Sequence, residues 1–248
     1  MLNAALGTAG LLTLGACSVD ADTQLEPMQV KPVTIETVPT PEQRSPAIIS
    51  ATSLDDPHSL TVIVNKQRPL NPQNYRPDDL VVPAVCSSAP GQELLRACAA
   101  EGLAKLAAAA AANGTPLILL SRFRSYDTQI ATYNSWVSTL GKSNADSASA
   151  RPGFSEHQTG LAADIGDSAG CNLQSCFAAQ PLALWVKDHC HEFGFVVRYQ
   201  PDLQGTTGFY EEPWHLRYLG TELATAVVRS GVRTLEEHFG LPAAPDYL

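Results

Sequence analysis

The sequence has no basic cluster, no internal repeat and no apolar run of the length that crosses a membrane. Its 16 lysine and arginine residues are outnumbered by 25 aspartate and glutamate residues, and the formal net charge is −9. Without a basic patch the chain lacks the electrostatic attraction on which nucleic-acid binding depends, so we expect no nucleic-acid partner. Hydrophobic residues make up 44% of the sequence, enough for the core of a single domain, which we expect to be a monomer.

The N-terminus reads MLNAALGTAGLLTLGAC, an apolar stretch without a charged residue. It is shorter than the roughly 20 residues of a transmembrane helix, and it ends in small residues, as export signals do. Its last part, from Leu14 to Cys17, resembles a bacterial lipobox, although the lysine or arginine usual at the start of such a signal is missing. On this interpretation residues 1–16 are a lipoprotein signal peptide, and a lipid on Cys17 anchors the exported protein to the membrane, facing the cell wall. The alternative is an apolar terminus without a targeting role.

The segment that follows has the composition of a linker. Residues 17–57 are rich in proline, threonine and acidic side chains and show no apolar periodicity. As a flexible coil this segment would reach roughly 35 Å. We therefore predict a disordered linker over 17–57 and a folded domain over 58–248.

Six cysteines are present, without the paired short spacings of a cysteine zinc site. Export permits disulfides, and Cys171 and Cys176 are close enough in sequence to close a loop. Cys86 with Cys98 is the next candidate bridge, which leaves Cys190 as a free thiol on a helix. An alternative zinc site would use Cys171, Cys176, Cys190 and His189 or His191.

Helical and strand-like segments alternate along the chain without a regular βαβ rhythm. The apolar patterns predict helices over 92–112, 128–140, 181–193 and 221–230, with glycine or proline near several of their ends. They predict strands over 116–123, 161–165, 195–199 and 215–219. This order favours an α+β domain with a small, mainly antiparallel sheet and flanking helices.

Two segments some fifty residues apart carry the side chains of a metal site. SEHQTGLAAD contains His157 and Asp164, and EEPWH contains His215 and Glu212. Two imidazoles and one carboxylate would leave one position of a catalytic zinc open to water, with a glutamate to spare as the general base. Extended chain from His157 to Asp164 would span roughly 23 Å, so the chain must turn between them. Gly160 suits that turn, and a strand over 161–165 would then carry Asp164.

The second segment requires a kink. Pro213 excludes a helix interior and pushes the residue before it toward extended backbone. On a flat strand Glu212 and His215 would face opposite sides, so a bulge at Pro213 is needed to bring both to one site. Trp214 between them would face the core or the substrate, and Arg217 would share the side of His215 and form a salt bridge.

The two segments match the signature of the VanY-type zinc D-alanyl-D-alanine carboxypeptidases, which are related to VanX dipeptidases and Hedgehog-like zinc peptidases. The signature is serine, any residue, histidine, six residues, aspartate, and later glutamate, any residue, tryptophan, histidine. The chain is also similar to this family in VNKQRPLNPQNYRPDDLV and SRFRSYDTQ, so that the resemblance covers about 180 residues, from Leu60 to Gly240. One departure is Arg122-Phe123, where relatives often have glycine and tyrosine.

The resemblance implies a role for each matched residue. His157, Asp164 and His215 would bind Zn²⁺, and Glu212 would be the general base and then the acid. Arg124, after an apolar run, would bind the terminal carboxylate of the substrate or stabilise the oxyanion, and the sequence does not separate these roles. Ser155 and Gln129 match polar positions that contact the substrate in this family, although either could instead be structural. Trp214 is a further candidate contact.

The implied activity is removal of the terminal D-alanine from peptidoglycan stem peptides. The metal residues do not read the configuration of the penultimate residue, so an L,D-carboxypeptidase acting on tetrapeptide stems remains an alternative. A VanX-type dipeptidase is a weaker one. A non-catalytic zinc-containing wall-binding module is the alternative from another class, but such a module would not need Glu212 as a base.

Overall fold

A computed structural model of the protein describes residues 51–88 and 94–248, all of which belong to one compact unit. The predicted signal peptide, the lipid on Cys17 and most of the predicted linker lie outside these residues and stay predictions. The folded part begins earlier than residue 58, because Leu54 of the 3₁₀ helix Ala51–Leu54 is buried and its carbonyl accepts a hydrogen bond from Ile63 N–H (2.9 Å). In the described part of the chain, no helix combines the length and apolar character needed to span a bilayer.

A four-stranded antiparallel sheet forms the centre of the fold. In spatial order its strands are β3 (Ile118–Ser121), β4 (Ala162–Gly166), β6 (Glu212–Tyr218) and β5 (Phe195–Tyr199). Two short strands, β1 (Leu80–Val81) and β2 (Leu95–Arg96), pair separately. The predicted α+β class with a small antiparallel sheet is confirmed.

Seven α-helices surround the sheet in the described residues. They are α1 (Ala97–Ala112), α2 (Tyr126–Leu140), α3 (Lys142–Ala148), α4 (Pro181–His189), α5 (Gln204–Thr207), α6 (Thr221–Ser230) and α7 (Leu235–His238). The helix predicted to start at 92 starts at Ala97, because the two residues before it pair with β1. α2 begins two residues before the predicted start, since the Ser125 side chain caps it by accepting Thr128 N–H (3.1 Å).

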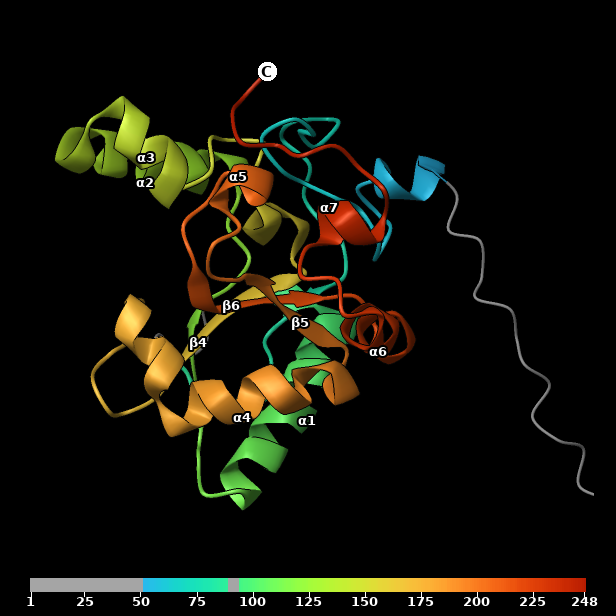
Figure 1. The fold of residues 1–248 in the computed structure, drawn as a ribbon, viewed down its shortest axis with the longest axis vertical. Helices are drawn as coiled ribbons and strands as arrows, with labels where there is room; N and C mark the ends of the chain where they lie inside the picture. Colours follow the sequence, from blue (N-terminus) through green and yellow to red (C-terminus); the bar gives the residue numbers. More distant parts are fainter. Residues whose placement is uncertain (1–50, 89–93) are drawn as a thin grey trace, which may run out of the picture. The chain divides into compact units, whose positions relative to one another are not determined.

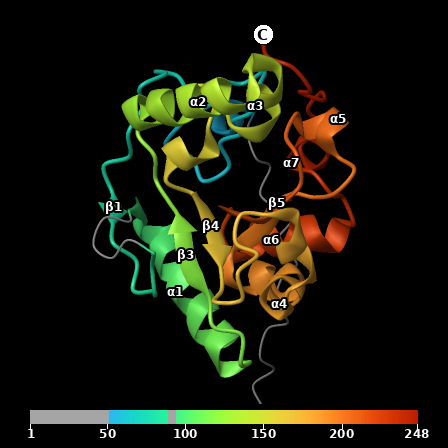
Figure 2. The same ribbon diagram turned by 90° about the vertical axis from the view of Figure 1, so that its left-hand side faces the viewer.

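The two faces of the sheet have different partners. Ala163, Ile165 and Leu216 are fully buried in the main core, together with side chains of α1 and α4. These two helices lie together on one side of the sheet, and α2, α3 and α5 lie on the other (Figure 1). Figure 2 shows α1 beside β3, with α2 and α3 at the opposite end of the view. Because side chains alternate along a strand, Asp164 and His215 face away from the core helices.

The helix α2 contributes less to the core than its apolar pattern indicates. Of the apolar residues of α2 only Tyr133 is buried, and its hydroxyl donates to Asp146 Oδ1 of α3 (2.6 Å). Ile130 and Leu140 are 38% and 39% exposed. Leu140 lines the cleft described next, so α2 forms a wall of that cleft.

Candidate active site

The backbone brings the three predicted metal ligands together from a 3₁₀ helix and two adjacent strands. His157 lies in the 3₁₀ helix Glu156–Thr159, which Gly160 ends with a left-handed φ of 69°. The chain then enters β4, where Asp164 is the direct partner of His215 on β6. The predicted turn at Gly160 and the predicted strand carrying Asp164 are both confirmed.

The three side chains form a compact cluster. His157 Nε2 lies 3.3 Å from Asp164 Oδ2, and His215 Nδ1 lies 3.1 Å from Asp164 Oδ1. One ligand atom from each residue lies within 4.8 Å of the others, and all three residues are buried. Ligand bonds to zinc are about 2 Å long, so one ion can reach all three atoms. Asp164 Oδ1 is buried and accepts no hydrogen bond from the described residues, as a metal-binding oxygen would.

The other nitrogen of each imidazole has a partner outside the cluster. His157 Nδ1 donates to the carbonyl oxygen of Arg122 (2.8 Å), and His215 Nε2 donates to Glu156 Oε2 (3.3 Å). Such outer hydrogen bonds fix the tautomer and the orientation of a metal-binding histidine. They leave His157 Nε2 and His215 Nδ1 free to bind the ion.

Glu156 belongs to a buried network of four charged side chains. Its Oε1 accepts hydrogen bonds from Arg198 Nε (2.9 Å) and Arg217 Nη1 (3.1 Å). Arg198 also pairs with Glu236 of α7, at 2.6 and 2.9 Å. Burial alone would raise the pKa of Glu156, but Arg198 and Arg217 outweigh it and hold that pKa well below its usual range. Two cations and two anions balance, so the network holds His215 without adding net charge.

The sequence predicted only one member of this network, the salt bridge of Arg217, which is confirmed. The sequence does contain an indication of Arg198, because a charged residue in the apolar strand FVVRY needs a buried partner of opposite charge. Glu156 and Glu236 have no local signal, because their partners come from distant parts of the chain.

Glu212 reaches the cluster through the predicted kink. Val197 pairs with Leu216 and Tyr199 pairs with Glu212. The same stretch of the sheet therefore spans four residue positions along β6 but only two along β5. This irregularity around Pro213 brings Glu212 Oε2 to 3.4 Å from His215 Nδ1. Burial, with the negative charge of Asp164, raises the pKa of Glu212 above its usual value. A carboxylate with a raised pKa is a better proton acceptor near neutral pH.

The cluster opens into a cleft of about 890 Å³. The three predicted metal ligands line it, together with most of the other predicted site residues, namely Glu212, Arg124, Ser155 and Trp214. Gln129 does not: it is fully buried, and its amide donates to the carbonyl oxygen of Ala150 (2.6 Å). The predicted substrate contact at Gln129 is therefore wrong. Ala150 lines the cleft, and Gln129 supports this part of the cleft wall from behind.

Arg124 follows the apolar run as predicted, three residues after β3 ends at Ser121. Its guanidinium donates to Ser121 Oγ (3.4 Å) and forms no ion pair with a carboxylate of the described residues. Burial lowers the pKa of Arg124, while Asp164 and Glu212 act in the opposite direction. The side chain therefore offers the cleft a positive charge close to the cluster.

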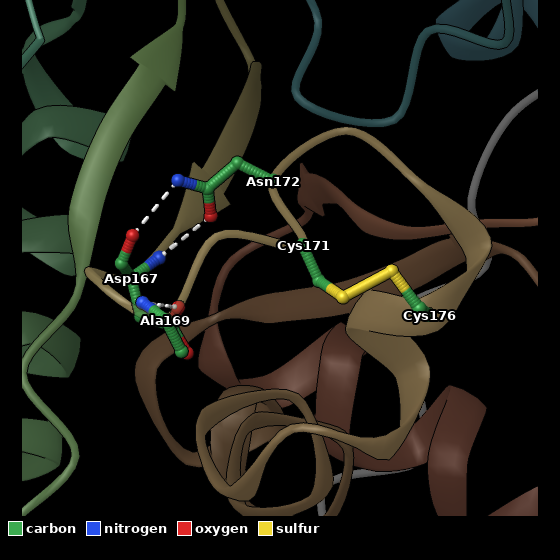
Figure 3. The surroundings of a disulfide bond; sticks show 5 residues. All are labelled: Asp167, Ala169, Cys171, Asn172 and Cys176. Carbon is green, nitrogen blue, oxygen red and sulfur yellow. Dashed lines mark hydrogen bonds between the residues drawn. A yellow bond between two sulfur atoms is a disulfide. The ribbon is translucent and has the colours of Figure 1, made fainter.

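A disulfide closes the loop that follows β4. Cys171 and Cys176 are bonded as predicted, which also excludes the alternative cysteine zinc site (Figure 3). Beside the bridge, Asn172 Oδ1 accepts Asp167 N–H (2.9 Å) and its Nδ2 donates to the Asp167 carbonyl (2.8 Å). Leu173, between the two cysteines, lines the cleft.

The second predicted bridge is wrong, since Cys86 and Cys98 are both free thiols. Cys86 is exposed and its carbonyl pairs with Leu119 N–H of β3 (2.9 Å), whereas Cys98 lies in the first turn of α1. Cys190 is the predicted free thiol, and burial raises its pKa to about 12, which keeps it in the unreactive protonated form.

Replacing both Cys171 and Cys176 by serine is expected to lower the free energy of unfolding by about 2 kcal/mol, because the open loop gains conformational entropy in the unfolded chain. The KM for a peptide substrate should also rise, since Leu173 would lose its fixed place in the cleft. Denaturant unfolding and steady-state kinetics measure the two effects. The matched control is Cys86→Ser at an exposed free thiol, which should change neither. Parent-like stability of the double variant would contradict a clamping role.

Comparisons with known proteins agree with this geometry. The family model described as VanY, D-alanyl-D-alanine carboxypeptidase, matches residues 92–221, just over half of the chain. YodJ of Bacillus subtilis (strain 168) is 39% identical over 191 residues, which are 75% of this chain and 69% of YodJ. The solved structure of LdcB, an LD-carboxypeptidase, gives a TM-score of 0.69 at 38% identity and covers 74% of this chain and 87% of LdcB. A mutant of the D,D-pentapeptidase VanY from a VanB-type resistance cassette, in complex with Zn(II), gives 0.61 at 31% identity, covering 73% of this chain and 99% of VanY.

The matched residues include the whole candidate site. All three predicted ligands, His157, Asp164 and His215, lie within the span of the family model, as do Glu212 and Arg124. The resemblance predicted from the sequence motifs is thereby confirmed. The chain belongs to the VanY family of D-alanyl-D-alanine carboxypeptidases.

Proposed function

We propose that the protein is a zinc-dependent carboxypeptidase that removes the terminal D-alanine from peptidoglycan stem peptides. The observation that carries the proposal is the cluster of His157, Asp164 and His215 within 4.8 Å, with Glu212 at 3.4 Å from His215. The Zn(II) in the related VanY structure supports the choice of metal. Two nitrogens and one carboxylate oxygen are also the donor set of catalytic zinc sites.

His157, Asp164 and His215 would hold the metal through the atoms that face one another. Zinc, when bound, supplies a Lewis acid that polarises the scissile carbonyl and lowers the pKa of a water to about 7. Glu212 takes a proton from the attacking water and passes it to the nitrogen of the departing D-alanine, which leaves as a neutral amine. Arg124 contributes its positive charge on the same wall of the cleft, where a guanidinium can bind the terminal carboxylate.

The configuration of the penultimate residue separates two candidate activities. A D,D-carboxypeptidase shortens the pentapeptide stem, as the description of the family model suggests. An L,D-carboxypeptidase removes D-alanine from the tetrapeptide stem, and the 38% identity to LdcB, against 31% to VanY, favours this second candidate. Both activities use the same ligands and the same base.

The test is mass spectrometry of pentapeptide and tetrapeptide stems incubated with the protein, with a chelator, and with zinc added back after chelation. We expect loss of one alanine that the chelator stops and zinc restores. Loss from the pentapeptide alone would establish the D,D activity, and loss from the tetrapeptide alone the L,D activity. A folded, zinc-loaded protein that cleaves neither peptide would refute the proposal and favour the wall-binding alternative.

A further inference from the structure

Three arginines line the cleft, and the proposed chemistry uses one of them. Arg124 stands beside the metal ligands, whereas Arg76 and Arg122 have no role in the reaction. The protein as a whole is acidic, with a net charge of −9, so positive charges gathered in one cleft are not a reflection of its composition. Arg122 is also the residue at which the sequence departs from the family pattern.

Arg76 and Arg122 line the same cleft, and Arg76 contacts Phe123, the residue that follows Arg122. The guanidinium carbon of Arg76 lies 4.8 Å from the centre of the Phe123 ring, a cation–π contact. Arg122 precedes this phenylalanine, and its carbonyl oxygen accepts the hydrogen bond from His157 Nδ1. The backbone of Arg122 is therefore fixed beside the metal ligands, while its half-buried side chain lines the cleft.

Neither guanidinium has an anionic partner among the residues that the structure describes. Five other arginines form ion pairs with carboxylates, namely Arg68, Arg96, Arg151, Arg198 and Arg217. In residues 51–88 and 94–248, no carboxylate lies within ion-pair distance of Arg76 or Arg122. Burial lowers the pKa of Arg124, and repulsion by the nearby charge of Arg122 lowers it further. Cations that repel one another across a cleft are stabilised when an anion enters.

We propose that Arg76 and Arg122 form a second carboxylate subsite, an inference that rests on the proposed function. This subsite binds an inner carboxylate of the stem peptide, while Arg124 binds the terminal carboxylate. Two residues of such a peptide can supply that group. The second residue is joined through its γ-carboxyl, so its α-carboxylate is free unless it is amidated. The third residue has a side-chain carboxylate when it is diaminopimelate and none when it is lysine. The shared ligand chemistry is a single carboxylate on the amino-terminal side of the scissile bond.

The test measures binding, so that it does not depend on turnover. Isothermal titration calorimetry gives the Kd of zinc-loaded Glu212→Gln protein for two matched pairs of pentapeptides: D-isoglutamate against D-isoglutamine at the second position, and diaminopimelate against lysine at the third. We expect the peptide with the carboxylate to bind about tenfold more tightly in one pair or both, and the responding pair identifies the source.

The same titrations on Arg76→Gln/Arg122→Gln protein should bring the Kd ratio of the responding pair close to one. Arg229→Gln, an exposed arginine of α6 that does not line the cleft, is the matched control and should leave the ratio unchanged. Equal Kd values in both pairs, or a preference that survives the double substitution, would overturn the subsite. Failure of the proposed function appears separately, as the absence of cleavage by the parent protein.

Discussion

A Glu212→Gln variant is expected to lose about 100- to 10,000-fold in kcat while it still binds the metal. The amide keeps the size of the side chain, but it cannot accept the proton of the attacking water. Glu212 is not one of the three clustered ligands, so the metal stoichiometry should stay at that of the parent. Rates of alanine release, followed by mass spectrometry, and metal content, measured by elemental analysis, check the two halves of this expectation.

The neighbouring Glu211 provides the control for this experiment. It also borders the cleft, but it is not part of the metal cluster. Glu211→Gln is expected to keep a rate near that of the parent. Near-normal turnover by Glu212→Gln, or a large loss in Glu211→Gln, would show that the base is assigned to the wrong residue.

The second large effect is expected from Glu156→Gln, which removes the carboxylate that two arginines and His215 share. Arg198 would keep Glu236, but Arg217 would be left fully buried without a carboxylate partner. Breaking a buried ion pair in this way costs about 3–5 kcal/mol of folding free energy. His215 would also lose the acceptor that orients its ring, and loss of such a partner lowers metal affinity about 10- to 100-fold.

Denaturant unfolding of the metal-free protein and competition with a coloured chelator measure these two quantities separately. The control is Glu101→Gln, which removes an exposed ion pair to Lys105 on α1 and should alter neither stability nor metal affinity appreciably. A loss of stability with parent-like metal affinity would mean that Glu156 supports the fold but does not position His215.

The cluster of His157, Asp164 and His215 could be predicted from the sequence because the chemistry of a catalytic zinc restricts residue types and spacing. The same holds for the turn at Gly160 and the bulge at Pro213, since each follows from the backbone preference of one residue. Strand β5, over Phe195–Tyr199, was predicted with its observed limits because its alternating pattern begins directly after Gly194.

What the sequence did not reveal depends on contacts between distant segments. Glu156 meets Arg198 and Arg217, which lie 42 and 61 residues away, and no local pattern encodes such a meeting. The late start of α1, at Ala97 and not at residue 92, has a similar cause, because pairing of β2 with β1 overrides helix propensity. Gln129 shows the same limit for side chains. Its position on α2 does not reveal whether its amide points into the cleft or donates to the backbone behind the cleft wall.

Asp164 and His215 meet only when β4 pairs with β6 in its native register. A slip by one residue would turn a ligand to the core face of the sheet. The unfolded chain therefore contains no preformed site, and strand pairing must come before capture of the ion. An ion that binds only the folded form stabilises it by mass action, by about 1.4 kcal/mol for each tenfold excess of metal over its Kd. Metal supply would then govern the fraction of the protein that is folded as well as its activity.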